Sequence, residues 1–339
     1  MNDHAELPDI HPAVLASNQV SGALIHLDRH PDSLVRWPFA DLDALTGPMG
    51  EGEVWFVSAF SGGGKTTFIA SAIDAWRQLG KRVFVMPLEL QPNRFRTMLA
   101  CMETGIFPGD ALSGALRADP SRVAERETLK SALLGQTSTA YTKSVMVSEQ
   151  RAINVRGLER GMMEAKAFGA DVVIVDHIDH IEGEGKGSLY TASKEVNHAA
   201  LRMAQDNGLL CVFTSQLNME IAKTDRLSKY APPMVHHNQF PSVKLQVATG
   251  MIGLFRPLRA PEPDEDPKAY KAAIADARSG LTDAADALEK GVMGVVAMKL
   301  RNYGQREGVR IKLAVERGRV LHLPERHQYG TTYGDRSRP

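Results

Sequence analysis

The sequence predicts an α/β fold in which a mostly parallel central sheet is flanked by helices and followed by a C-terminal antiparallel hairpin. Short apolar runs alternate with segments of helical periodicity, as in strand–helix–strand units. Residues 172–175 read Val-Val-Ile-Val, which is typical of a central strand covered on both faces. Near the C-terminus, VRIKLAV alternates apolar with polar residues and is joined to RVLHL at Arg317-Gly318, which predicts the hairpin.

The first strand–helix unit surrounds a glycine-rich turn. VWFVSA is an apolar run at residues 54–59, and a glycine-rich segment, SGGGKTT, comes shortly after it. Apolar residues then recur at helical spacing as far as Leu79, and Gly80 is placed to end that helix. The next apolar run, RVFVMPLE, predicts a second strand that ends at Glu89.

The middle of the chain continues the alternation. Residues 91–150 are mostly helical in pattern, with a short strand predicted at VMVS. Helices predicted over 154–168 and 193–207 each lead into an apolar strand, ADVVIVD and then LLCVFTSQLN. GMIGLF and GVVAMKL predict further strands. Residues 218–243 are polar and contain two consecutive prolines, so they are predicted to form a long loop.

The pattern divides the chain into three parts. Residues 1–35 are predicted to be an N-terminal arm or linker with a short helix near 12–27. Residues 36–323 form one domain, interrupted at about 258–292 by an acidic helical insertion. Residues 324–339 are polar and predicted to be a disordered tail.

Composition and charge argue against a protein that binds nucleic acid through its overall charge, a disulfide-bonded secreted protein and a membrane-spanning protein. The chain has 40 Lys plus Arg and 40 Asp plus Glu, so any nucleic-acid site must be local. The two cysteines, Cys101 and Cys211, lie in apolar surroundings that predict buried free thiols in a reducing compartment. The N-terminus has no secretory pattern, and no stretch has membrane-spanning length, so we expect a cytoplasmic protein.

The glycine-rich turn has the setting of a phosphate-binding loop. It joins a buried strand to a helix N-terminus, where free N–H groups and the helix dipole face an anion. Lys65 can reach the β- and γ-phosphates, and the Thr66 hydroxyl is a suitable Mg²⁺ ligand. Ala59 stands where such loops usually have glycine, and the alternative is a glycine-rich turn that binds nothing. The predicted phosphate-binding residues are Ser61, Gly62, Gly63, Gly64, Lys65, Thr66 and Thr67.

Polar residues at other strand ends offer the remaining parts of a triphosphate-hydrolysing site. Asp176 ends the Val-Val-Ile-Val strand, where an acid would hold Mg²⁺ opposite the loop. Glu89 could polarise water or be a surface carboxylate, and Gln216 could sense the γ-phosphate or cap a turn. Lys299 and Arg301 alternate after an apolar run, so on a strand they would face the same way, either as phosphate-binding cations or as a solvated edge.

Histidines suggest a second metal hypothesis. His177 and His180 are three residues apart beside acids, and His236 adjoins His237 in the predicted loop. Without cysteine partners these residues fit a structural zinc site poorly, so Mg²⁺ with a nucleotide is the metal the sequence favours. Aromatic residues are 6% of the chain, which favours phosphate-backbone contacts over base stacking at any DNA site.

Six ordered motifs resemble the ATPase domain of DnaB-type hexameric replicative helicases, within the RecA-like group of P-loop ATPases. WPFADLDALTG with GEVWFVSA looks like the entry to the first strand, AFSGGGKT like Walker A, and MPLEL like the strand of the catalytic glutamate. VVIVDHID looks like Walker B, TSQLN like the sensor strand, and KLRNYG like the strand bearing the lysine and arginine fingers. The resemblance extends from about Trp37 to Leu323.

The resemblance implies a role for each candidate residue. Lys65 and Thr66 would bind the phosphates and the metal of Mg²⁺–ATP, and Asp176 would coordinate Mg²⁺. Glu89 would activate water, and Gln216 would couple the nucleotide state to the DNA-binding loop. After the sensor strand this chain departs from the family pattern, because Val247 stands where an acid is expected.

The resemblance also implies an assembly. Lys299 and Arg301 would act on the ATP of a neighbouring subunit in a homo-hexamer or similar ring. The implied function is an ATP-dependent DNA helicase, a motor that translocates on single-stranded DNA and unwinds duplex during replication, with a loader or primase as a further partner. The DNA-contacting candidates are the basic loop residues Lys186, Lys223, Arg226 and Lys229.

Two other functions remain open on the sequence. One is a RecA-like DNA-binding ATPase, a recombinase or a loader and remodeller, that hydrolyses ATP without unwinding DNA. Two features favour it: only about 35 residues precede the core, where such helicases have an N-terminal helical domain, and the segment after the sensor strand is altered. The other is a metabolic kinase, which would need an acceptor pocket and no cations from a neighbouring subunit.

Overall fold

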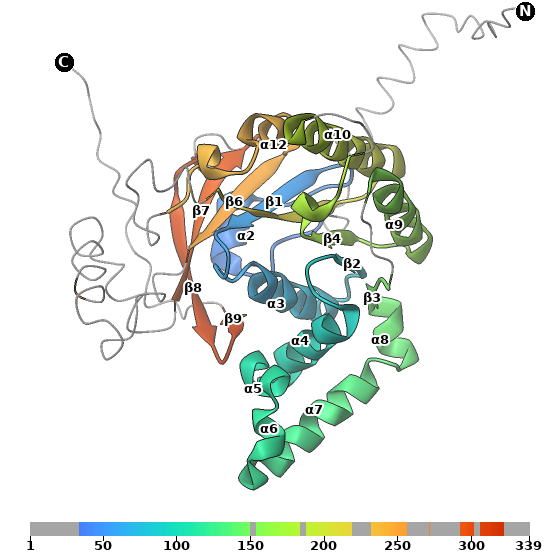
Figure 1. The fold of residues 1–339 in the computed structure, drawn as a ribbon, viewed down its shortest axis with the longest axis vertical. Helices are drawn as coiled ribbons and strands as arrows, with labels where there is room; N and C mark the ends of the chain where they lie inside the picture. Colours follow the sequence, from blue (N-terminus) through green and yellow to red (C-terminus); the bar gives the residue numbers. More distant parts are fainter. Residues whose placement is uncertain are drawn as a thin grey trace, which may run out of the picture.

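A single nine-stranded sheet organises the computed structural model, which describes residues 34–149, 154–183, 188–218, 232–255, 271, 292–301 and 306–321. The strands are β1 (Val54–Ala59), β2 (Val83–Pro87), β3 (Val145–Val147), β4 (Val172–Asp176), β5 (Cys211–Gln216), β6 (Gly250–Phe255), β7 (Val292–Leu300), β8 (Arg310–Glu316) and β9 (Arg319–Leu321). Their order across the sheet is β3-β2-β4-β5-β1-β6-β7-β8-β9 (Figure 1).

The sheet is parallel from β3 to β6 and antiparallel from β6 to β9. This confirms the predicted fold, including the hairpin, in which Arg317 and Gly318 both have positive φ angles between β8 and β9. In the parallel part all carboxyl ends lie at one edge. The ends of β1, β2, β4 and β5 therefore place the residues that follow them next to one another.

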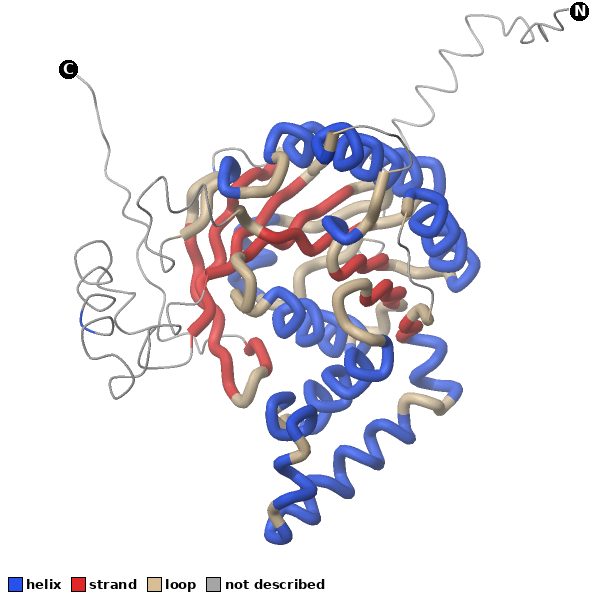
Figure 2. The backbone as a smooth tube through the Cα atoms, in the orientation of Figure 1, coloured by secondary structure: helices blue, strands red, loops and turns tan. Residues whose placement is uncertain are grey.

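Helices cover both faces of the sheet (Figures 1 and 2). One face packs against α2 (Ala40–Thr46), α3 (Lys65–Gln78) and α4 (Pro92–Thr104), and the other against α9 (Val155–Phe168), α10 (Leu189–Asn207) and α12 (Pro241–Val247). Strand β1 shows why both layers form. Trp55 and Val57 belong to the first hydrophobic cluster and Phe56 to the second, because alternate side chains of a strand point to opposite faces.

A helical excursion separates α4 from β3. It contains α5 (Pro108–Ser113), α6 (Ala115–Ala118), the 3-10 helix η2 (Pro120–Arg122), α7 (Val123–Gly135) and α8 (Thr139–Ser144). Figure 2 shows these helices extending away from the sheet. Gly114, with a φ of 82°, ends α5 in the left-handed conformation that glycine adopts without strain. The excursion agrees with the helical pattern predicted over 91–150.

The prediction of a loop over residues 218–243 is wrong for the C-terminal part of that segment. The 3-10 helix η4 (Val235–His237) lies within it, and α12 begins at Pro241. The proline starts this helix because the first helical position has no intrahelical use for an N–H group. Helix α10 begins at Leu189, earlier than predicted, because the Ser188 hydroxyl accepts a hydrogen bond from the N–H of Thr191.

Several predictions fall outside the described residues. They are the arm up to residue 33, the acidic insertion apart from Lys271, and the tail. Within the described residues the core begins at Val35, which is buried and bridges to Met49. Cys101 and Cys211 are free and buried, as predicted. None of the helices in this part of the chain combines the length and the apolar character needed to span a membrane.

Candidate functional site

The turn after β1 is a tight loop that requires glycine at successive positions. Gly62 and Gly64 have φ angles of 64° and 94°, which side-chain-bearing residues rarely adopt. A Cβ atom on Gly63 would lie 2.8 Å from the Phe60 carbonyl oxygen and 2.9 Å from the Ala59 Cβ. Helix α3 begins at the next residue after Gly64, so the loop presents backbone N–H groups at a helix N-terminus, the arrangement that binds phosphate.

Lys65 is the first residue of α3 and its side chain is buried, with 6% of its surface exposed. Its Nζ donates to the Ala59 carbonyl oxygen at 3.4 Å. Burial lowers the pKa of Lys65, while the neighbouring carboxylates of Glu89 and Asp176 oppose that shift. A cation held in such a water-poor setting interacts strongly with an incoming anion, which suits a phosphate group.

Asp176 lies at the end of β4 and is completely buried. Its carboxylate accepts hydrogen bonds from the Thr66 hydroxyl at 3.0 Å and from the Thr214 hydroxyl at 2.5 Å. Burial raises the pKa of Asp176, and the hydrogen bonds from Thr214 and Thr66 act against it. The oxygens of Thr66 and Asp176 are hard ligands side by side next to the phosphate loop, so the donor set fits Mg²⁺.

Glu89 follows β2 and is held beside Asp176 by the backbone. The N–H groups of Leu88 and Glu89 donate to the Asp176 carbonyl oxygen at 2.6 and 2.9 Å. The Glu89 carboxylate itself is exposed, and its Oε2 lies 3.7 Å from the Nε2 atom of His177. Its backbone is therefore held at the edge of the phosphate loop, and its carboxylate is accessible to solvent.

Gln216 ends β5, directly opposite Ala59 in the sheet register. Its N–H donates to Asp179 at 2.8 Å, and the neighbouring Ser215 hydroxyl donates to the same oxygen at 3.0 Å. The structure thus brings Gln216 next to the strand end from which the phosphate loop starts.

Lys244, in α12, completes this network and was not identified from the sequence. Its side chain is 0% exposed, and its Nζ pairs with Asp179 Oδ1 at 2.7 Å and donates to the Ser215 hydroxyl. Burial raises the pKa of Asp179, but the charge and hydrogen bond of Lys244 and the N–H of Gln216 lower it overall. A lysine in the short segment SVKLQV gives no sequence signal of burial, because surface helices have the same pattern.

Lys299 and Arg301 lie at the opposite edge of the sheet. The Lys299 ammonium donates to the carbonyl oxygens of Leu245 and, at 2.8 Å, Ala248, and the Arg301 guanidinium donates to that of Gln246 at 3.2 Å. Burial and the charge of Arg301 lower the pKa of Lys299. Both side chains therefore bind the C-terminal end of α12.

The sheet register explains this separation. Strand β7 is antiparallel to β6, and Leu300 pairs with Gly250, the first residue of β6. The phosphate loop follows the far end of β1, a strand of six residues beside β6. At about 3.3 Å per residue, roughly 20 Å of strand separates Arg301 from that loop. Within one chain the two cations do not meet Lys65.

The remaining predicted residues divide into two groups. Ser61, Gly62 and Thr67 lie in or next to the phosphate loop, whereas the DNA-contacting candidates Lys186, Lys223, Arg226 and Lys229 lie outside the described residues. His237 is buried, and its Nδ1 accepts the N–H of Met234, which accounts for it as a cap of η4.

Comparisons with known proteins agree with this fold. Residues 35–286 match the model of the family described as the DnaB-like helicase C terminal domain. A solved structure described as an ATPase domain has a TM-score of 0.67 at 16% identity, covering 93% of this chain and 100% of that one. A DnaB-like replicative helicase, studied for its interactions with primase, has a TM-score of 0.65 at 16% identity, covering 93% and 68%. No curated protein sequence matches the chain.

Proposed function

The chain belongs to the DnaB-like helicase C terminal domain family of ATP-hydrolysing helicases, and on that premise we propose that it forms a ring, translocates on single-stranded DNA and unwinds duplex. One observation supports the ring above all others. Lys299 is a half-buried cation and Arg301 is an exposed one. Both are separated from the phosphate loop of their own subunit by about the length of one strand. Cations there can complete an ATP site only if that site belongs to another subunit.

The half of the site within one subunit binds the nucleotide. Backbone N–H groups of the loop and the Lys65 ammonium bind the β- and γ-phosphates, and Thr66 and Asp176 hold Mg²⁺. When bound, Mg²⁺ neutralises charge between the phosphates. Lys65 is already desolvated, so its interaction with the developing negative charge needs little reorganisation.

Glu89 orients and deprotonates the attacking water. It is the exposed carboxylate at the loop edge, and its backbone position is fixed by Asp176. Gln216 and Asp179 transmit the nucleotide state from the loop through β5 to α12, because the Asp179 carboxylate binds both Gln216 and Lys244.

Changing Glu89 to Gln is expected to lower ATP hydrolysis by about 10²- to 10⁴-fold, the usual contribution of a general base. Nucleotide affinity should be retained, because the phosphate-binding groups are untouched. Steady-state hydrolysis and binding of a fluorescent ATP analogue measure the two effects. Glu103, an exposed residue of α4, provides the matched control Glu103→Gln, which should leave both unchanged. If Glu89→Gln hydrolysed ATP at the normal rate, Glu89 would not be the general base.

Strand displacement on a forked DNA substrate tests the function itself. The protein with ATP should separate the fork and form rings on single-stranded DNA that are visible by electron microscopy. Lys65→Ala should abolish both hydrolysis and unwinding, since it removes the phosphate-binding cation. A loader or recombinase would hydrolyse ATP and leave the fork intact. ATP hydrolysis that is indifferent to single strands, together with a monomeric protein, would contradict the proposal.

Contacts with the strand and with partners are part of the same proposal. Lys186, Lys223, Arg226 and Lys229 bind the phosphate backbone of single-stranded DNA, which makes the affinity fall with salt. The likeness to a replicative helicase studied with primase supports a primase as a further partner. A loader is the alternative partner. Salt titration of DNA binding measures the first of these contacts.

A further inference from the structure

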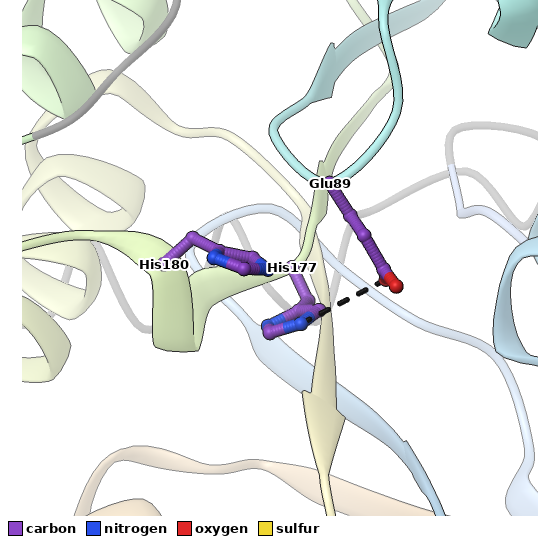
Figure 3. A group of neighbouring side chains, drawn as sticks. All are labelled: Glu89, His177 and His180. Carbon is purple, nitrogen blue, oxygen red and sulfur yellow. Dashed lines mark ion pairs between the residues drawn. The ribbon is translucent and has the colours of Figure 1, made fainter. Parts of the chain in front are cut away.

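Three side chains with metal-ligating atoms lie together at the edge of the nucleotide site (Figure 3). Glu89, His177 and His180 each have a ligand atom within 4.8 Å of the others. Glu89 follows β2, whereas His177 follows β4 and His180 ends the 3-10 helix η3 (Ile178–His180). Strands β2 and β4 are neighbours in the sheet, so residues 88 positions apart in the sequence come together.

His177 is the fixed member of this group. It is 5% exposed, and its Nδ1 makes no hydrogen bond and lies 3.8 Å from the Asp179 carboxylate. Its Nε2 lies 3.7 Å from the Glu89 carboxylate. Its ring centroid is 4.0 Å from that of His180, with the planes tilted by 35°.

We propose that Glu89, His177 and His180 form an inhibitory binding site for a transition-metal ion of the Zn²⁺ type, separate from Mg²⁺–ATP. Two imidazoles and one carboxylate are a known zinc ligand set that leaves a fourth position open, whereas Mg²⁺ prefers oxygen ligands alone. At Zn–N distances of about 2.1 Å, tetrahedral ligand atoms are about 3.4 Å apart. The group must contract from its present spacing, and Glu89 and His180 are exposed and can rotate toward His177.

Metal binding at this position has a direct consequence for hydrolysis. A Glu89 carboxylate coordinated to Zn²⁺ is a weaker base, because the cation withdraws electron density from both oxygens, and it is held at the metal and away from the attacking water. Zinc therefore inhibits without competing for the phosphate loop. This consequence rests on the proposed role of Glu89, whereas metal binding by the three residues does not.

Metal binding is measured first, in the full chain without nucleotide. Calorimetric titration with Zn²⁺ and the visible absorption of bound Co²⁺ should give one site per chain. His180→Gln should weaken binding by at least about tenfold, because it removes one ligand. His198, an exposed histidine of α10, gives the matched control His198→Gln, which should bind as the unsubstituted protein does. Absence of the site, or equal affinity in His180→Gln, overturns the proposal.

The second measurement is ATP hydrolysis with excess Mg²⁺ and increasing Zn²⁺. The unsubstituted protein should lose activity as the site fills and regain it with a zinc-selective chelator. His180→Gln should keep its basal activity and resist Zn²⁺. If Zn²⁺ binds without inhibiting, the inhibitory part of the proposal is wrong. If the protein binds Zn²⁺ at this site but hydrolyses no ATP under any condition, the proposed function fails and the metal site stands.

Discussion

Arg301→Ala should lower DNA-stimulated ATP hydrolysis by about 10³- to 10⁵-fold, the range by which an arginine finger stabilises the transition state. The guanidinium lies at the sheet edge opposite its own phosphate loop, so the loss should occur at a neighbour's ATP. ATP binding should persist, because Lys65 and the glycine loop are intact. Hydrolysis on saturating single-stranded DNA is the measurement. Arg117→Ala, at an exposed arginine of α6, is the matched control and should retain activity.

Mixing two inactive variants tests whether Arg301 acts between subunits. Lys65→Ala lacks a working phosphate loop and keeps Arg301, whereas Arg301→Ala keeps the loop. A mixed ring contains interfaces with an intact loop from one subunit and an intact arginine from the other. Those interfaces should restore part of the hydrolysis that neither variant shows alone. A mixture as inactive as its components would place Arg301 outside a shared site.

Lys244→Met should lower the free energy of unfolding by about 3–5 kcal/mol, the usual cost of breaking a buried ion pair from one side. The substitution keeps an apolar chain in the space but leaves the buried Asp179 carboxylate without its ammonium partner. Urea unfolding followed by circular dichroism measures the change. Lys194→Met, at an exposed lysine of α10, should change stability by less than about 1 kcal/mol.

Two further measurements identify the ion pair as the cause. Lys244→Met combined with Asp179→Asn should recover part of the loss, because no unpaired charge is then buried. The pKa of Asp179 is below its ordinary 3.8 in the folded protein. Its contribution to stability is therefore complete above pH 3.8 and is lost as the pH falls through the lower, folded pKa. Fully additive losses in the double variant would contradict the assignment.

The sequence predicted which residues lie together around the glycine-rich loop, because that grouping follows from local rules. A strand, a glycine turn and a helix determine the position of Lys65. Parallel strands bring Glu89, Asp176 and Gln216 to the same edge. None of these inferences needs the order of the strands across the sheet, so a single amino-acid sequence is enough to make them.

Other features depend on that order and could not be predicted. The grouping of Glu89 with His177 and His180 requires β2 and β4 to be neighbours, and the sequence pattern does not state which strands pair. The resemblance implied that Arg301 acts on a neighbouring subunit. The residue pattern alone did not give its separation from Lys65, because that separation requires β7 to be antiparallel to β6. The burial of Lys244 depends on α12 packing beside Asp179, and residues 241–243, which begin that helix, were predicted to belong to a loop.

Helix α12 has seven residues and is about 10 Å long, yet it contacts residues next to both parts of the proposed ATP site. Lys244 connects it to the Asp179 carboxylate, which also binds the end of β5, and carbonyl oxygens at its C-terminal end accept hydrogen bonds from Lys299 and Arg301. In a ring, the loss of the γ-phosphate from the ATP of one subunit would change the positions of Lys299 and Arg301, the cations that this subunit places in the ATP site of the next one. The order of hydrolysis around the ring would then depend on α12, a helix of about two turns. Each subunit would determine when its neighbour hydrolyses ATP.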